Sequence, residues 1–96
     1  ADLALGYLNP DYFLGGAMPL SAESSRAAIA AQVGQPLGLA DELAAWGIHD
    51  SVNENMAAAA KMYATERGVD TSVLTLIASG GAGPVHCYGL ARKLGI

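Results

Sequence analysis

The glycines between Leu74 and Leu94, in the stretch LTLIASGGAGPVHCYGLARKL, have the spacing that most clearly allows chemistry. The apolar run Leu74 to Ala78 is typical of a short buried strand, and Pro84 is typical of the first turn of a helix. Between them, Gly80-Gly81-Ala82-Gly83 would turn sharply, and its backbone N–H groups could approach a ligand with no Cβ in the way. The helix would add unpaired N–H donors and the positive end of its dipole. The sequence therefore predicts a strand, a glycine loop and a helix, and the loop either binds a phosphate or ribose group or is only a tight turn.

Two specific nucleotide-binding motifs are absent from this loop. A dinucleotide fingerprint, GxGxxG, beginning at Gly81 requires glycine at the position of His86. A phosphate-cradling loop, GxxxxGK[ST], requires Gly-Lys-Ser or Gly-Lys-Thr, and the chain has neither. The loop therefore belongs to neither of these classes.

A long helix is predicted from about Ala40 or Asp41 to Arg67, where a glycine follows. Its main apolar stripe is centred on Ile48 and includes one amide, Asn55, which needs a hydrogen-bond partner if it is buried. Asn55 either bonds a neighbouring backbone group or a buried water, or it reaches the ligand site at the glycine loop. The other members of the stripe are Ala44, Val52, Ala59, Met62 and Tyr63. The opposite face, which could also be covered, consists of Trp46, Asn53, Ala57 and Ala60.

The remaining reactive side chains give no catalytic or metal site. His86 and Cys87 are adjacent, so on a helix they diverge by about 100° and cannot act as a nucleophile and base pair. Cys87 fits a small buried hydrophobe, whereas His86, near the glycine loop, has either a site role or a capping and packing role. His49 is expected to be exposed or satisfied. Because two histidines and one cysteine stand without clustered carboxylates, we predict no metal site, and the catalytic residues are not identified.

Composition limits the class of protein. Of the 96 residues, 52% are hydrophobic and 15% are charged, which is apolar for so short a chain, so we expect it to self-associate or to pack against more protein. The net charge of -4 and the lack of an extended basic patch argue against nucleic-acid binding. No apolar run approaches the length of about 18 residues that a membrane span needs. Because the chain has a single cysteine, it cannot form an internal disulfide, which favours a reducing compartment. No targeting peptide is visible, so we expect a cytoplasmic location.

The element order predicts a predominantly helical α/β segment. Residues 1–20 are expected to be an irregular lead-in, residues 21–68 two helices of which the first is capped by Ser21, and residues 69–96 the strand, glycine loop and last helix. The long helix would extend about 40 Å, more than the diameter of a compact domain of this size. This length predicts that the chain is a part of a larger protein.

Five short motifs follow one another along the chain. They are Phe13-Leu14-Gly15-Gly16, Ala45-Trp46-Gly47-Ile48, Asn53-Glu54-Asn55-Met56, Glu66-Arg67-Gly68 and Gly80-Gly81-Ala82-Gly83-Pro84. In these motifs and their order, the sequence resembles the hydantoinase A and ATP-dependent 5-oxoprolinase family, which also includes subunits of acetone and acetophenone carboxylases. The resemblance covers nearly the whole chain. Because family members are several hundred residues long, it implies an internal segment of the catalytic domain.

The resemblance also implies a fold and an activity. The parent enzyme would have an ATPase domain of the actin and sugar-kinase type, and would use ATP and Mg²⁺ to open a cyclic amide such as 5-oxoproline or a hydantoin. The loop Gly80-Gly81-Ala82-Gly83 would line the adenosine side of the nucleotide, and the helix with Asn53 to Met56, including Asn55, would wall the same pocket. The family's first phosphate-binding and metal-binding elements would lie upstream of Ala1, so the 96-residue chain alone is expected to be inactive.

Two alternatives stay open from the sequence. The chain could be a segment of an ATP-dependent ketone carboxylase subunit, which differs from the hydrolases in substrate and in partner subunits. It could instead be a small helical module that self-associates and has no enzymatic role. For an enzyme, the expected partners are the rest of the parent chain and a second subunit of the hydantoinase type.

Overall fold

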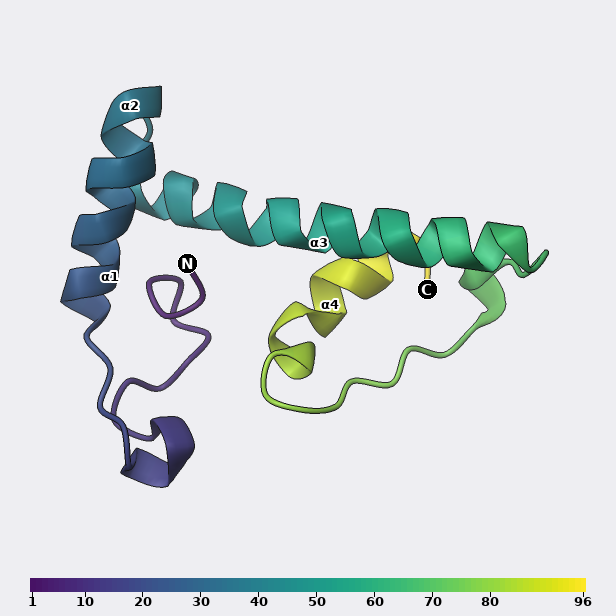
Figure 1. Ribbon diagram of the computed structural model, residues 1–96, viewed down its shortest axis with the longest axis horizontal. Helices are drawn as coiled ribbons and strands as arrows, with labels where there is room; N and C mark the ends of the chain where they lie inside the picture. The colour runs from purple at the N-terminus through teal and green to yellow at the C-terminus, as the bar shows by residue number, and fades with distance from the viewer. The chain divides into compact units, whose positions relative to one another are not determined.

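The computed structural model describes all residues 1–96, and every regular element in it is helical. The chain divides into two compact units, Ala1–His49 and Asp50–Ile96, and the division falls inside a long helix. The α-helices are α1 (Ala22–Ile29), α2 (Gln35–Leu37), α3 (Asp41–Glu66) and α4 (Gly83–Leu94), as Figure 1 shows. Short 3-10 turns lie at Phe13–Gly16 and Thr71–Val73, and a π-helical turn lies at Ala30–Gly34.

The first unit is built around the predicted cap of α1. The Ser21 side chain accepts a hydrogen bond from the backbone N–H of Ser24 at 3.1 Å, which satisfies one of the free donors at the start of the helix. The helical path continues through the π-helical turn and ends at Gly38, whose φ of 65° is a left-handed value that favours glycine. The buried core of this unit is small and consists of Ile29, Ala44 and Ala45.

The second unit consists of the second part of α3 with α4 packed against it. Their shared core contains Ala57 of α3 and Leu90 and Leu94 of α4, with Leu76 half-buried against them. Burial of each leucine side chain contributes about 1.5–3 kcal/mol. The hydroxyl of Thr71 donates to the backbone carbonyl of Leu94 at 3.0 Å, so the connection after α3 is tied to the end of α4.

The predicted α/β class is wrong, because the structure contains no strand. The segment Leu74 to Ala78 has no regular secondary structure, because a strand is defined by pairing with another strand and this segment pairs with none. Residues 75–79 accordingly donate no backbone hydrogen bond within the chain. The glycine loop is therefore preceded by an unpaired segment, and the expected strand, glycine loop and helix unit retains only its loop and helix.

The predicted core stripe of α3 is also wrong over most of its length. Ala44 is buried, but Asn55 is exposed, and Met62 and Tyr63 expose 63% and 59% of their surface. The buried residues of α3 include Asn53 and Ala57, from the opposite face that could also be covered, together with Ala45, His49 and Ala64. Small side chains on this face permit a close approach of neighbouring backbone, which hydrophobicity alone does not predict.

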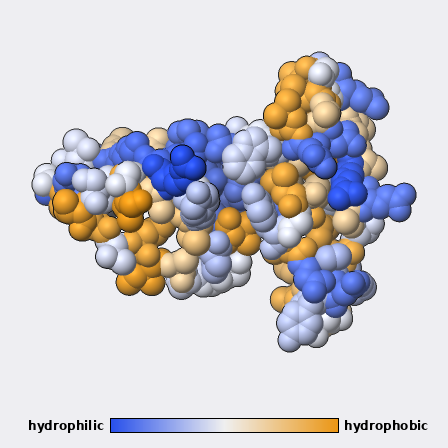
Figure 2. Space-filling view, turned by 180° about the vertical axis from the view of Figure 1, so that it is seen from behind, coloured by the Kyte–Doolittle hydropathy of each residue, from blue (hydrophilic) through white to orange (hydrophobic).

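Large apolar side chains remain on the surface, and Figure 2 shows them as separate orange areas on the face in view. Val73 and Ile77, in and after the second 3-10 turn, expose 77% and 83% of their surface. Exposed apolar surface of this extent is unusual for a chain this short and agrees with the composition. None of the helices combines the length and the hydropathy that a membrane span requires.

Candidate functional site

The glycine loop is open to solvent. Gly80 adopts a φ of 80°, and α4 begins at Gly83. A Cβ added to Gly80, Gly81 or Gly83 would meet no atom within 4 Å. The loop glycines are thus not required by close packing within this chain, and their backbone amides lie at an accessible surface.

The N-terminus of α4 has free hydrogen-bond donors. Its capping residue, Ala82, makes no side-chain hydrogen bond, and Pro84 has no N–H to satisfy. The N–H of Val85 donates to the carbonyl of Ala82 at 3.1 Å, which leaves the amides of the loop itself for water or a ligand. No lysine, arginine, aspartate or glutamate lies between Gly80 and Tyr88, so this stretch could bind an electron-rich group through backbone donors but offers no carboxylate for Mg²⁺.

Asn55 does not occupy the position that the sequence predicted. It is exposed on α3 and its side chain makes no hydrogen bond within the chain, so it needs no buried partner. Its role as a ligand contact stays a prediction. The amide that is buried in α3 is Asn53, two residues earlier, with 0% of its surface exposed.

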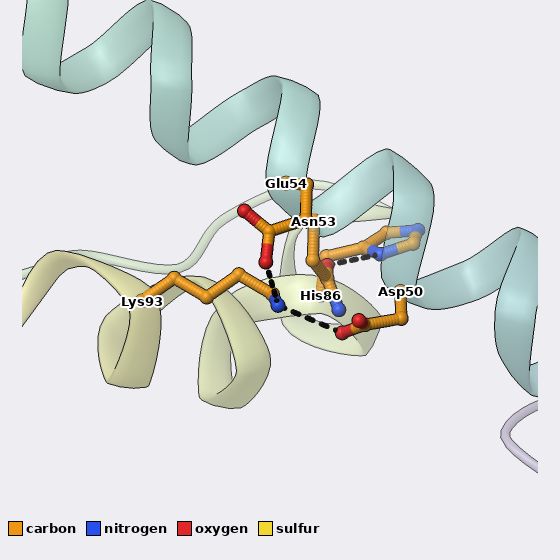
Figure 3. A network of polar contacts seen from close by, with 5 residues as sticks. All are labelled: Asp50, Asn53, Glu54, His86 and Lys93. Atoms are coloured by element: carbon orange, nitrogen blue, oxygen red, sulfur yellow. Dashed lines mark hydrogen bonds and ion pairs between the residues drawn. The ribbon is translucent and has the colours of Figure 1, made fainter.

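Asn53 of α3 and His86 of α4 form the buried polar centre of the second unit. Oδ1 of Asn53 lies 2.8 Å from Nδ1 of His86, and the ring is 9% exposed (Figure 3). Gly89, one turn after His86, allows this contact, because an added Cβ would stand 2.5 Å from Nδ2 of Asn53. The Nδ2 group is buried without a hydrogen-bond partner, which costs about 1–3 kcal/mol.

A lysine closes the same interface at its edge. Nζ of Lys93 lies 2.5 Å from Oε1 of Glu54 and 2.9 Å from Oδ1 of Asp50, which are one turn apart on α3 (Figure 3). The hydrogen bond to Glu54, followed by the one to Asp50, raises the pKa of Lys93 above its usual 10.5. The Glu54 side chain is 64% exposed, so these two ion pairs lie at the surface, and their contribution to stability should decrease as the salt concentration rises.

The other singled-out side chains have local roles. His49 is buried in the first unit, where its Nδ1 lies 2.7 Å from Oδ1 of Asp2. The centroid of its ring lies 5.0 Å from that of Tyr7 and 5.6 Å from that of Trp46. The Asp2 contact makes it satisfied, one of the two alternatives that the sequence left open. Cys87 is half-buried, and its thiol donates to the carbonyl of Pro84 at 3.1 Å within α4.

Sequence reasoning missed the Asn53 and His86 pair, although one signal for it is present. A glycine inside a helix, such as Gly89, lowers helix stability and often marks a close approach of another group. His86 and Gly89 are three residues apart and share one face of α4. The signal identifies the face of α4, but it does not identify Asn53, 33 residues before His86, as the group that approaches.

Comparison with known proteins decides the family. The sequence pattern that describes hydantoinase/oxoprolinase proteins matches residues 1–96. The chain belongs to the hydantoinase/oxoprolinase family. The resemblance seen in the five sequence motifs is thereby confirmed.

Three relatives of the chain are named as enzyme subunits. It is 46% identical over 90 residues to the acetophenone carboxylase gamma subunit of Aromatoleum aromaticum, covering 94% of the chain and 12% of that subunit. It is 41% identical over 93 residues to the acetone carboxylase beta subunit of Xanthobacter autotrophicus, covering 97% and 13%. It is 39% identical over 95 residues to the caprolactamase subunit alpha of Pseudomonas jessenii, covering 99% and 14%.

A solved structure is similar along nearly the whole chain. Acetone carboxylase in its nucleotide-free form, from a study of ATP-dependent acetone carboxylation, matches with a TM-score of 0.88 and 40% identity. The match covers 98% of the 96 residues and 13% of the acetone carboxylase chain. The 96 residues therefore span about an eighth of the relatives that they match.

Proposed function

We propose that these 96 residues are a segment of an ATP-dependent ketone carboxylase subunit. The observation that carries the proposal is the pair of carboxylase relatives at 46% and 41% identity, together with the 40% identical acetone carboxylase structure. These matches favour the carboxylase alternative over the cyclic-amide hydrolase that was the main expectation from the sequence. In the proposed reaction, ATP cleavage drives the carboxylation of a ketone, which forms a carbon–carbon bond between the ketone and the new carboxyl group.

A cyclic-amide hydrolase is the second candidate, because the chain is 39% identical to a caprolactamase subunit. A ketone and a lactam both present a carbonyl oxygen that a phosphoryl group from ATP could activate. Both candidates therefore use ATP. They differ in the step that follows: the carboxylase forms a carbon–carbon bond at the ketone, whereas the hydrolase opens the ring of the cyclic amide. A non-enzymatic self-association module finds no support in these relatives.

We further propose that the loop Gly80-Gly81-Ala82-Gly83 contacts the nucleotide. Support comes from its open backbone donors at the uncapped start of α4. Asn55, exposed on α3, is the proposed additional contact. Mg²⁺ would be held by other parts of the enzyme, since the loop and the first turns of α4 have no carboxylate.

The relatives also support a multisubunit assembly. Their names identify them as gamma, beta and alpha subunits, so we propose that the parent protein acts with partner subunits. Because the 96-residue chain is only a small part of one subunit of such an assembly, it would have no activity of its own.

The test is the substrate dependence of ATP consumption by the full-length protein assembled with its partner subunits. Acetone or acetophenone with bicarbonate should stimulate ATP consumption, and caprolactam or 5-oxoproline should not. The reverse pattern would favour the hydrolase and overturn the carboxylase proposal.

A loop variant tests the nucleotide contact in the same assay. Gly81→Val places a branched side chain over the loop amides, yet its Cβ meets no atom and Gly81 has no positive φ, so the fold is preserved. We expect the KM for ATP to rise at least tenfold. The matched control is Gly47→Ala on α3, where an added Cβ also meets no atom within 4 Å and where the KM should not change. An unchanged KM in Gly81→Val would remove the loop from the nucleotide site.

A further inference from the structure

The amide group of Asn53 has one acceptor and two donor hydrogens, and only its oxygen is paired. Oδ1 lies 2.8 Å from Nδ1 of His86, whereas Nδ2 is buried without a partner. Figure 3 shows the nitrogen turned away from the ring and toward the backbone of α4. With oxygen toward the ring, Nδ1 of His86 must carry the proton, and two donor hydrogens of Nδ2 remain unused.

The surroundings of Nδ2 favour an oxygen at its place. The Cβ that Gly89 lacks would lie 2.5 Å from Nδ2, so the amide nitrogen packs directly against the Cα of Gly89 and its hydrogen. A Cα–H group is a weak donor, and it attracts a carbonyl oxygen but not an N–H group. This close contact also leaves no room there for a water that could accept from Nδ2.

Rotation of the amide by 180° about its Cβ–Cγ bond gives one of the two Nδ2 hydrogens an acceptor and removes the unfavourable contact of Nδ2 with Gly89. The rotation exchanges two atoms of nearly equal size, so the packing of α3 on α4 is unchanged. Oδ1 then faces the Cα–H of Gly89, and Nδ2 faces Nδ1 of His86 at hydrogen-bond distance. For Nδ2 to donate, Nδ1 must present its lone pair, and the neutral ring must carry its proton on Nε2.

We propose that Asn53 donates an amide hydrogen to Nδ1 of His86 and thereby holds the ring as the tautomer protonated on Nε2. Asn53 is a positioning residue in this arrangement. It makes Nε2 of His86 the donor nitrogen of a buried ring that lies in the first turns of α4, shortly after the glycine loop. The proposal rests on this geometry and does not depend on the proposed carboxylase function.

The experiment is a two-bond ¹H–¹⁵N correlation spectrum of the 96-residue chain labelled with ¹⁵N-histidine, recorded at mildly alkaline pH. The chain has two histidines, and a His49→Gln sample assigns the signals of His86. We expect the Nδ1 signal of His86 at the position of a nitrogen without hydrogen and the Nε2 signal at the position of a protonated nitrogen. A protonated Nδ1, alone or together with a protonated Nε2, would overturn the proposal.

A variant pair separates positioning from simple packing. Asn53→Asp replaces the amide by a carboxylate that can only accept, so the proton of His86 should move to Nδ1 and the pattern of the two signals should reverse or become that of a cation. The matched control is Asn55→Asp, two residues later on α3 and exposed, which should leave the spectrum unchanged. An unchanged tautomer in folded Asn53→Asp would show that Asn53 does not set it. If Asn53→Asp does not fold, the wild-type spectrum decides the proposal alone.

Discussion

Replacing Gly89 by alanine should destabilise the second unit, although alanine is the better helix former. The new Cβ would stand 2.5 Å from the amide atom of Asn53 that faces Gly89, whereas ordinary van der Waals contact begins at 3.4 Å, so the two groups must separate by 3.4 − 2.5 = 0.9 Å. Overpacking of this kind costs about 1–3 kcal/mol. Displacing Asn53 from His86 leaves a buried polar group unpaired and costs a further amount of about 1–3 kcal/mol. The gain in helix propensity is about 1 kcal/mol, so the net loss is about 1–5 kcal/mol.

Urea unfolding of matched proteins measures this loss. Gly89→Ala should lower the midpoint at an unchanged slope, whereas the control Gly47→Ala, whose Cβ meets no atom within 4 Å, should raise the free energy of unfolding by about 1 kcal/mol. In an Asn53→Ala background the obstructing amide is absent, so Gly89→Ala should become neutral or stabilising. A Gly89→Ala protein as stable as the wild type would refute the reasoning about this contact.

Three further changes test the packing of α4. Leu90→Ala should cost about 2–5 kcal/mol in urea unfolding, whereas Ile77→Ala, at a side chain that is 83% exposed, should change stability by less than about 0.5 kcal/mol. Thr71→Val removes the hydroxyl that donates to the last residue of α4 and should cost about 0.5–1.5 kcal/mol; no loss would show that this bond does not stabilise the unit. Lys93→Met should reduce stability slightly at neutral pH and less at high salt. Because the hydrogen bond to Glu54 raises the folded pKa of Lys93 above 10.5, this contribution is present below pH 10.5 and is lost as the pH rises through the folded pKa. An equal difference between variant and wild type on both sides of that window would contradict the assignment.

Local sequence signals predicted local structure well. Ser21 as the cap of α1 and a glycine shortly after the end of α3 follow from the preferences of single residues, and both occur in the structure. The family, too, could be identified, because short motifs in a fixed order carry that information without any knowledge of contacts.

Features that depend on partners distant in the sequence could not be predicted. Leu74 to Ala78 has the composition of a strand, but pairing needs a second extended segment, and composition does not reveal whether one is present. The main buried face of α3 was assigned from its apolar stripe, which favoured Met62 and Tyr63, and the face of Asn53 and Ala57 was only a second face that could also be covered. The structure uses the face of Asn53 and Ala57, because α4 approaches closely only where side chains are small or paired.

The carboxylase assignment is tested most directly by fixation of ¹⁴C-bicarbonate by the full-length protein with its partner subunits and ATP. The account predicts that label enters a non-volatile carboxylate product when acetone or acetophenone is present, and that none is fixed when ATP or the ketone is omitted. ATP-dependent ring opening of caprolactam or 5-oxoproline, with no label fixed in the presence of either ketone, would contradict it.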